Sequence, residues 1–100
     1  MAQPIYRFYM TRFTEPWYQL SQEERTGIVK QLSEAFEKVG GTVVLRCDSA
    51  LATDQWPHFG VEELPDIAAE QAYGKVLQEL GWYRYVEGMT LLGTRTEPLP

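Results

Sequence analysis

The sequence predicts an α+β fold in which a four-stranded sheet carries two helices, and three features indicate it. A strand-like segment rich in aromatic and β-branched residues opens the chain at residues 5–13. Two later segments repeat apolar side chains at the 3.6-residue spacing of an amphipathic helix. The closing segment, residues 81–95, carries apolar and aromatic side chains at both odd and even positions. We therefore expect both faces of the last predicted strand to be buried against other parts of the protein.

The first predicted strand, residues 5–13, has two different faces, and residues 14–18 form a loop after it. Side chains alternate between the two faces of a strand, so one face is apolar and the other mixes polar with apolar groups. The apolar face carries Tyr6, Phe8 and Met10, and the mixed face carries Ile5, Arg7, Tyr9 and Thr11.

The first helix has clear signals at both ends. Ser21 and Glu24 have the spacing of a capping box, in which each side chain satisfies a free backbone donor of the first turn. Gly40 and Gly41 end the helix, because glycine tolerates the left-handed cap. The predicted buried stripe comprises Ile28, Val29, Leu32, Ala35, Phe36 and Val39.

The second and third strands are predicted at residues 42–47 and 56–63, on either side of a polar loop. Asp66 is the expected N-cap of the second helix, which ends at Gly81. Gly74 costs this helix about 1 kcal/mol relative to alanine, unless a close packing contact requires a glycine there. The predicted buried stripe comprises Ala69, Ala72, Tyr73, Val76, Leu77 and Leu80.

The fourth strand follows Gly81 directly and completes the order β-α-β-β-α-β in a single domain of residues 1–100. This is the ferredoxin-like pattern, an antiparallel four-stranded sheet with two helices on one face. Its alternation puts Tyr83 and Tyr85 on one side and Trp82 and Arg84 on the other. Because the strands are two-sided, we expect a homodimer in which the open sheet faces of two subunits pack together around a two-fold axis.

Composition excludes several functional classes. The net charge is -5, and the nine lysines and arginines are scattered without a basic run, so we expect neither nucleic-acid binding nor an anionic membrane partner. No apolar run approaches the roughly 20 residues of a membrane-spanning helix. Residues 1–4 lack a secretory leader, and the single cysteine, Cys47, cannot form an internal disulfide. We therefore expect a cytoplasmic protein.

His58 is the one histidine and the candidate catalytic residue, because a histidine side chain can exchange protons near neutral pH. The alternatives are a hydrogen-bonded strand histidine at an interface or surface, and a haem ligand without a second supporting feature. Cys47 could be a nucleophile, although an isolated cysteine is usually a small buried hydrophobe. One histidine and one cysteine do not make a zinc site, and no glycine-rich phosphate loop is present. We expect no metal and no cofactor.

Aromatic residues make up 13% of the chain and could line an apolar cavity with a few polar tips, as in small-molecule sites. The same side chains could serve the core and the dimer interface, and we expect both uses. If the first and third strands are neighbours, Arg7 could meet His58 or Glu62. Such pairs are usually structural, but an arginine beside a buried carboxylate also suits a ligand carboxylate or enolate. The candidate substrate-binding residues are Tyr6, Arg7, Trp17, Trp56, Tyr73, Arg84 and Tyr85.

Three segments carry a resemblance to a known superfamily: residues 17–21 with Glu24-Arg25, residues 58–62 with Pro65-Asp66, and residues 81–87. In these segments the chain resembles the dimeric α/β-barrel superfamily, and within it a poorly characterised bacterial branch. The resemblance implies a pocket between helices and sheet in each subunit. Members include cofactor-free monooxygenases, polyketide cyclases, lactone isomerases, dehydratases and haem-binding or haem-degrading proteins, so the resemblance does not choose a reaction.

The leading functional hypothesis is a cofactor-independent enzyme that acts by proton transfer on a small, apolar carbonyl compound, as an isomerase, cyclase or dehydratase would. His58 would be the acid or base, and Arg7 or Arg84 would stabilise negative charge. The pocket would be shaped by Tyr6, Trp17, Trp56 and Tyr85. Two alternatives are a non-catalytic binding protein for a hydrophobic small molecule and an interaction module whose aromatic surface serves only the dimer.

Overall fold

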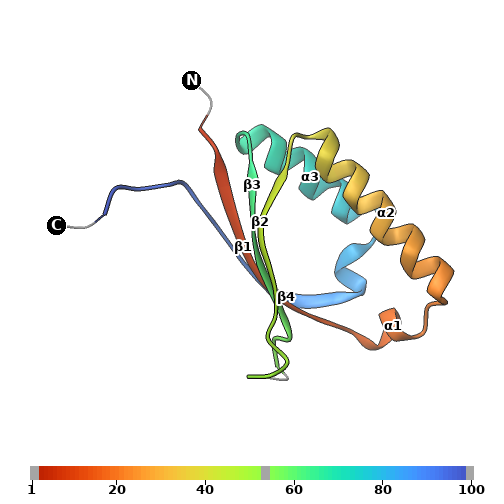
Figure 1. The fold of residues 1–100 in the computed structure, drawn as a ribbon. Helices are drawn as coiled ribbons and strands as arrows, with labels where there is room; N and C mark the ends of the chain where they lie inside the picture. Colours follow the sequence, from red (N-terminus) through yellow and green to blue (C-terminus); the bar gives the residue numbers. More distant parts are fainter. Residues whose placement is uncertain (1–2, 53–54, 99–100) are drawn as a thin grey trace.

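The computed structural model describes residues 3–52 and 55–98 of the 100-residue chain. The elements are β1 (Ile5–Phe13), α1 (Glu15–Tyr18), α2 (Gln22–Lys38), β2 (Thr42–Asp48), β3 (His58–Leu64), α3 (Ile67–Glu79), the 3-10 helix η1 (Trp82–Arg84) and β4 (Val86–Gly93). Helices α2 and α3 cover one face of the sheet (Figure 1). This arrangement confirms the predicted α+β, ferredoxin-like fold.

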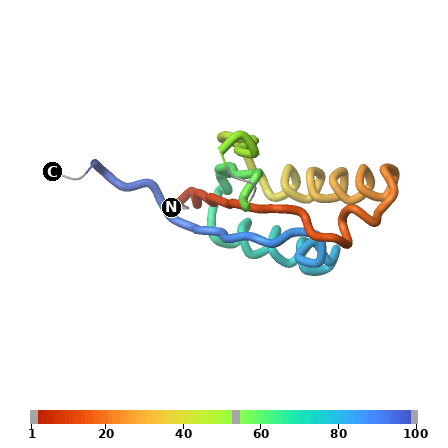
Figure 2. The backbone as a smooth tube through the Cα atoms, turned by 90° about the horizontal axis from the view of Figure 1, so that it is seen from below, coloured from red at the N-terminus to blue at the C-terminus, as the bar shows by residue number. Residues whose placement is uncertain are grey.

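The sheet has the strand order β2-β3-β1-β4, and all neighbouring strands are antiparallel. The first strand is therefore central, and it runs beside the last strand, as the red and blue segments of Figure 2 show. The sheet is open, with β2 and β4 as its edges, and does not close into a barrel within one chain.

Both long helices begin where the sequence predicts. The Ser21 amide donates to Glu24 Oε1 at 2.9 Å, and Ser21 Oγ accepts from the Glu24 amide at 3.0 Å, which completes the capping box of α2. Asp66 Oδ1 accepts from the Ala69 amide at 2.8 Å and caps α3. A Cβ atom at Gly74 would meet nothing within 4 Å, so no packing contact among the described residues requires this glycine.

The buried core lies between the helices and the sheet, and it consists of Leu32, Phe36, Leu64, Tyr73 and Leu77. Four of these side chains come from the two predicted helical stripes. Two other members of those stripes, Val29 and Ala72, are exposed. Val29 borders a cavity, because the space between α2 and the sheet is only partly filled by side chains.

The prediction that the last strand follows Gly81 directly is wrong. Gly81 adopts a left-handed conformation with φ +69°, and the 3-10 helix η1 follows it. The amides of Arg84 and Tyr85 donate to the carbonyls of Gly81 and Trp82 at 3.0 and 2.9 Å. These turn hydrogen bonds replace strand pairing until Val86, so the alternation predicted for residues 82–85 does not exist.

Two smaller boundaries also differ from prediction. Strand β3 begins at His58 rather than at Trp56, and the predicted loop after β1 contains the short helix α1. Pro16 lies in the first turn of α1, where its missing amide hydrogen costs no helical hydrogen bond.

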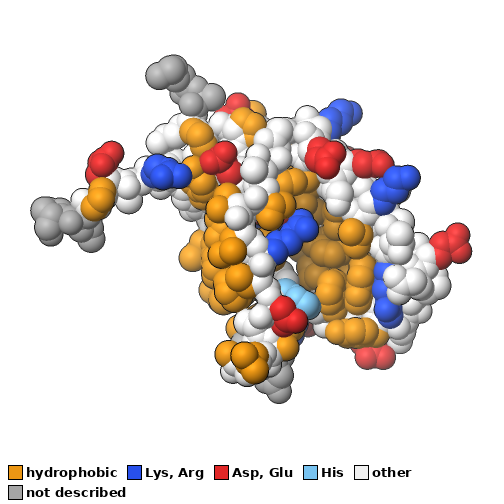
Figure 3. Space-filling model, in the orientation of Figure 1, with side chains coloured by type: hydrophobic (Ala, Val, Ile, Leu, Met, Phe, Trp, Pro, Cys, Tyr) orange, Lys and Arg blue, Asp and Glu red, His pale blue; other side chains and the backbone are white. Residues whose placement is uncertain are grey.

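The side of the sheet opposite the helices has an apolar middle, with Glu63 and the Arg12–Glu87 ion pair toward its ends. We call it the open sheet face and define it by Phe8, Met10, Leu45, Phe59, Val61, Met89 and Leu91, which the strand register places on one side. Met89 and Leu91 are 54% and 62% exposed. Hydrophobic side chains gather to the left of the sheet and in the hollow between sheet and helices in Figure 3.

Candidate functional site

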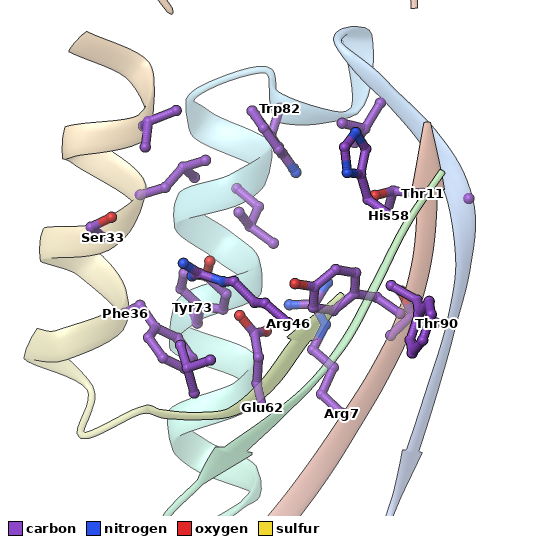
Figure 4. Close-up of a pocket in the computed structure, with 18 of the residues that line it drawn as sticks. Arg7, Thr11, Ser33, Phe36, Arg46, His58, Glu62, Tyr73, Trp82 and Thr90 are labelled. Atoms are coloured by element: carbon purple, nitrogen blue, oxygen red, sulfur yellow. The ribbon is translucent and has the colours of Figure 1, made fainter. Parts of the chain in front are cut away.

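A cavity of about 740 Å³ lies between the sheet and helices α2 and α3. Its volume falls within the roughly 300–1,000 Å³ of small-molecule sites. Strand β1 contributes its odd-numbered side chains to the wall: Arg7, Tyr9, Thr11 and Phe13. The hollow in Figure 3 and the side chains in Figure 4 show that charged groups line a space that is otherwise largely apolar.

One end of the cavity is charged. Arg7 and Glu62 are register partners on β1 and β3, and they are only 9% and 7% exposed. The Arg7 guanidinium lies 5.7 Å from the centre of the Tyr73 ring, within the range of a cation–π interaction. Arg46 reaches the same end from β2, and the four side chains converge in Figure 4. We call these four residues the charged end.

The charges at this end are not neutralised by direct pairing. Arg7 and Glu62 form no ion pair, and Arg7 Nε is buried without a hydrogen-bond partner in the described part of the chain. Glu70 Oε2, on α3, is also buried without one. An arginine of this kind can bind an anion that enters the cavity, because its Nε donor has no acceptor among the described residues.

Burial also changes the proton affinities at the charged end. It raises the pKa of Glu62, while Arg7 and Arg46 oppose the rise. Burial likewise raises the pKa of Glu70. The pKa of Tyr73 is raised to about 12, mainly by burial and then by Glu62, so its hydroxyl keeps its proton at neutral pH and can donate a hydrogen bond.

The opposite end of the cavity is mostly aromatic and contains His58. The His58 ring meets the Phe13 ring edge-on, with centroids 5.5 Å apart, and Thr11 is its register partner on β1. Trp82 of η1 lies on the helix side of this end (Figure 4). His58 and Glu62 lie on the same face of β3, four residues apart, which separates their Cα atoms by about 13 Å.

Three of the eight predicted site residues, Arg7, His58 and Tyr73, line this cavity. The described cavity wall does not include Tyr6, Trp17, Trp56, Arg84 or Tyr85. Tyr6 lies on the other face of the sheet, where its hydroxyl accepts a hydrogen bond from Arg95 at 3.1 Å. The Trp56 ring lies 5.2 Å from the Arg12 guanidinium.

Of the other three residues, Trp17 belongs to the short helix α1, and Arg84 and Tyr85 lie beside that helix. The Trp17 ring stacks on Phe13, with centroids 4.5 Å apart and planes at 11°, and Tyr85 meets Trp17 edge-on at 5.9 Å. Arg84 is exposed, and its carbonyl accepts a hydrogen bond from the Thr14 hydroxyl at 2.7 Å. These contacts hold α1 beside the aromatic end of the cavity, so the three residues act on the cavity only through its supporting structure.

Tyr9, Phe13, Glu62 and Trp82 line the cavity although they are absent from the predicted set. Strand alternation could have found three of them, because Tyr9 and Phe13 share a face with Arg7, and Glu62 shares one with His58. Trp82 could not be found in this way, because it belongs to a 3-10 helix that the sequence did not predict.

No group of three or more potential metal-ligating side chains occurs among residues 3–52 and 55–98. Within the same ranges, no helix has the length and apolar character required to cross a membrane. Cys47 is a half-buried free thiol opposite Phe59 on the neighbouring strand.

The chain is similar in structure to solved proteins, but no protein-family model and no curated protein matches its sequence. One similar structure is the RPA0582 protein of unknown function from Rhodopseudomonas palustris, with a TM-score of 0.70 and 21% identity. That match covers 98% of this chain and 86% of the other. A structure of methylated RPA0582 has a TM-score of 0.68 and 17% identity, with 98% and 84% covered. At these identities the likeness shows the fold alone.

Proposed function

We propose that the protein is a cofactor-independent enzyme that moves a proton on an apolar carbonyl compound bound in the cavity. One observation carries the proposal. A largely apolar cavity of about 740 Å³ is lined by His58 and Glu62, whose side chains can exchange protons, and by the buried Arg7, which forms no ion pair with any described residue. Isomerisation, cyclisation and dehydration all need a proton carrier and a positive charge near the substrate. The apolar wall would exclude water from the reacting group.

His58 is the proposed acid or base. It lines the aromatic end, where flat apolar groups of a substrate would lie against Phe13 and Trp82. Of the two arginines in the hypothesis, Arg7 lines the cavity, whereas Arg84 is exposed on η1. Arg7 is therefore the residue that would hold negative charge.

The proposed active unit is a homodimer of the dimeric α/β-barrel type. The open sheet face supports this proposal. Strand β1 turns its apolar side chains to that face and its cavity-lining side chains to the other face. An exposed apolar patch of this kind is typical of an interface. A second copy of the chain could cover it by packing the same face against itself around a two-fold axis.

A proton-exchange experiment tests the enzymatic proposal. Aromatic ketones such as propiophenone and 2-tetralone are incubated with the protein in D₂O, and deuterium at the carbon next to the carbonyl is measured by NMR. We expect exchange above the buffer rate with the native protein and a loss of at least about 100-fold in His58→Gln. The control is Lys75→Gln, which changes an exposed residue of α3 outside the cavity wall.

The runner-up function is a non-catalytic binding protein for a hydrophobic small molecule, and the same cavity favours it. The exchange experiment separates the two functions when it is combined with calorimetric binding. Ketones that bind but exchange at the buffer rate would contradict the enzyme and support the binding protein. Equal exchange by the native protein and His58→Gln would remove the histidine from the mechanism.

A further inference from the structure

We propose that the charged end of the cavity binds the carboxylate of an amphipathic organic acid, with Arg7 as its buried contact and Arg46 as its second contact. This inference rests on the proposed function, because it takes the cavity as the substrate site. It adds a substrate class: carbonyl compounds that also carry a carboxylate at the far end of the molecule.

Arg7 is a buried cation with an unsatisfied donor. Its side chain is about nine-tenths buried and lines the cavity, and its Nε has no hydrogen-bond partner among the described residues. A buried N–H donor of a guanidinium without a hydrogen-bond acceptor is costly. A bound carboxylate could accept two parallel hydrogen bonds from it and relieve that cost.

His58 and Arg7 are separated along the length of the cavity (Figure 4). The Cα atoms of His58 and Glu62 are about 13 Å apart along β3, and Arg7 is the register partner of Glu62. His58 and Arg7 therefore lie at opposite ends of the cavity (Figure 4). When a carbonyl lies beside His58, the Arg7 guanidinium can therefore contact a more distant part of the same molecule. Its positive charge suits a second group of the same molecule.

Arg7 and Arg46 bring two positive charges to the charged end, and Glu62 and Glu70 bring two carboxyls. Repulsion from these carboxyls is stronger for a ligand group with two negative charges, such as a phosphate monoester, than for a group with one. A carboxylate carries one. Leu32, Leu77 and Trp82 line the cavity and would contact the apolar body of the acid.

The experiment uses 6-oxo-6-phenylhexanoate and its neutral amide, which differ only in the charge of the head group. Calorimetry measures both dissociation constants for the native protein, Arg7→Gln and Arg46→Gln. We expect the native protein to bind the acid at least about 10-fold tighter than the amide, because hydrogen bonds to charged groups are the strong ones. The ratio should fall below about 3 in both variants. Lys75→Gln, at an exposed position outside the wall, should keep the native ratio.

The ratio compares the acid and the amide on the same protein, so a variant that is merely less stable does not lose the preference for the acid. Arg46 is exposed, so Arg46→Gln keeps the test valid if Arg7→Gln fails to fold. An NMR readout is also available, because the Arg7 Nε–H signal should shift when the acid is added and shift less with the amide.

Each outcome has a distinct meaning. Equal binding of acid and amide would overturn the carboxylate site and leave the cavity as a substrate site. Tighter binding of the matching phosphate monoester than of the acid would overturn the carboxylate assignment. If neither probe binds and the Arg7 signal does not move, the cavity is not a ligand site, and the proposed function fails with it.

Discussion

Arg7 and Glu62 face each other across the two central strands, yet their charged groups form no ion pair. Opposite charges in register usually pair when they are buried, because each then offsets the desolvation of the other. Here both side chains line a cavity instead. The wall therefore holds a carboxyl and a guanidinium that are not joined by an ion pair, at a cost to the stability of the folded chain.

The first prediction concerns that cost. Burial raises the pKa of Glu62, so its ionised form is disfavoured in the folded state. The contribution of this carboxyl to stability is fully present below its ordinary pKa of 4.5 and is lost as the pH rises through the raised folded value. Glu62→Gln should therefore stabilise the protein near pH 8, and the gain should shrink as the pH falls toward 4.5.

Urea unfolding of both proteins between pH 4.5 and pH 8 checks this prediction. Glu70 and Tyr73 of α3, together with Arg7 and Arg46, influence Glu62 and are unchanged in the variant. The control is Glu63→Gln, on the opposite face of the same strand. A gain that is independent of pH, or equal in the control, would mean that burial of the Glu62 charge is not its cause.

The second prediction uses the glycine inside α3. A Cβ atom at Gly74 would meet nothing within 4 Å in the part of the chain that the structure describes, and alanine is about 1 kcal/mol more favourable than glycine in a helix interior. Gly74→Ala should raise the free energy of unfolding by about 0.5–1 kcal/mol without changing ligand affinity. Chemical denaturation measures the gain, and an unchanged or lower stability would show that the backbone there needs a glycine.

The third prediction contrasts Gly60, which faces the cavity on β3. A Cβ atom there would lie 2.5 Å from Tyr9 Oη and 2.7 Å from the Leu45 carbonyl oxygen. Gly60→Ala should cost about 1–3 kcal/mol, as overpacking does, and should displace the Tyr9 ring within the cavity. Adding Tyr9→Phe should recover part of the loss. Full additivity of the two changes in denaturation experiments would contradict a direct contact.

The fourth prediction tests the homodimer through the open sheet face. Leu91 is 62% exposed on β4 and lies beside Phe8 of the central strand. Leu91→Glu would place a charge inside the proposed interface, so sedimentation should show the native protein as a dimer and the variant as a monomer. Leu92→Glu changes the neighbouring residue on the other face of β4 and should remain dimeric. A native protein that sediments as a monomer at micromolar concentration would defeat the proposal.

The elements that the sequence predicted correctly depend on local signals. Ser21 and Asp66 begin their helices through hydrogen bonds within three residues. The alternation of β1 also needs only its own residues, and it places Arg7 on the same face as Tyr9. The sequence predicts these features correctly because they depend on neighbouring residues and not on distant contacts.

The features that could not be predicted depend on distant contacts. Trp82 has the side chain of a strand residue, but the left-handed Gly81 and packing against the core place it in a 3-10 helix. All eight predicted site residues are aromatic or basic, yet five of them lie outside the described cavity wall. Composition identifies side chains that suit a ligand, whereas only the tertiary fold decides which of them face the same space.

The central position of β1 limits the insertions and deletions that this strand tolerates. Its even-numbered side chains Phe8 and Met10 belong to the open sheet face, and its odd-numbered Arg7 and Tyr9 belong to the cavity. Inserting one residue early in this strand would exchange the two sets, because the side-chain period is two. A single-residue insertion or deletion in β1 should therefore damage both surfaces at once, and selection for the function of either surface should remove it from a variant library. A substitution, by contrast, can alter one surface without the other.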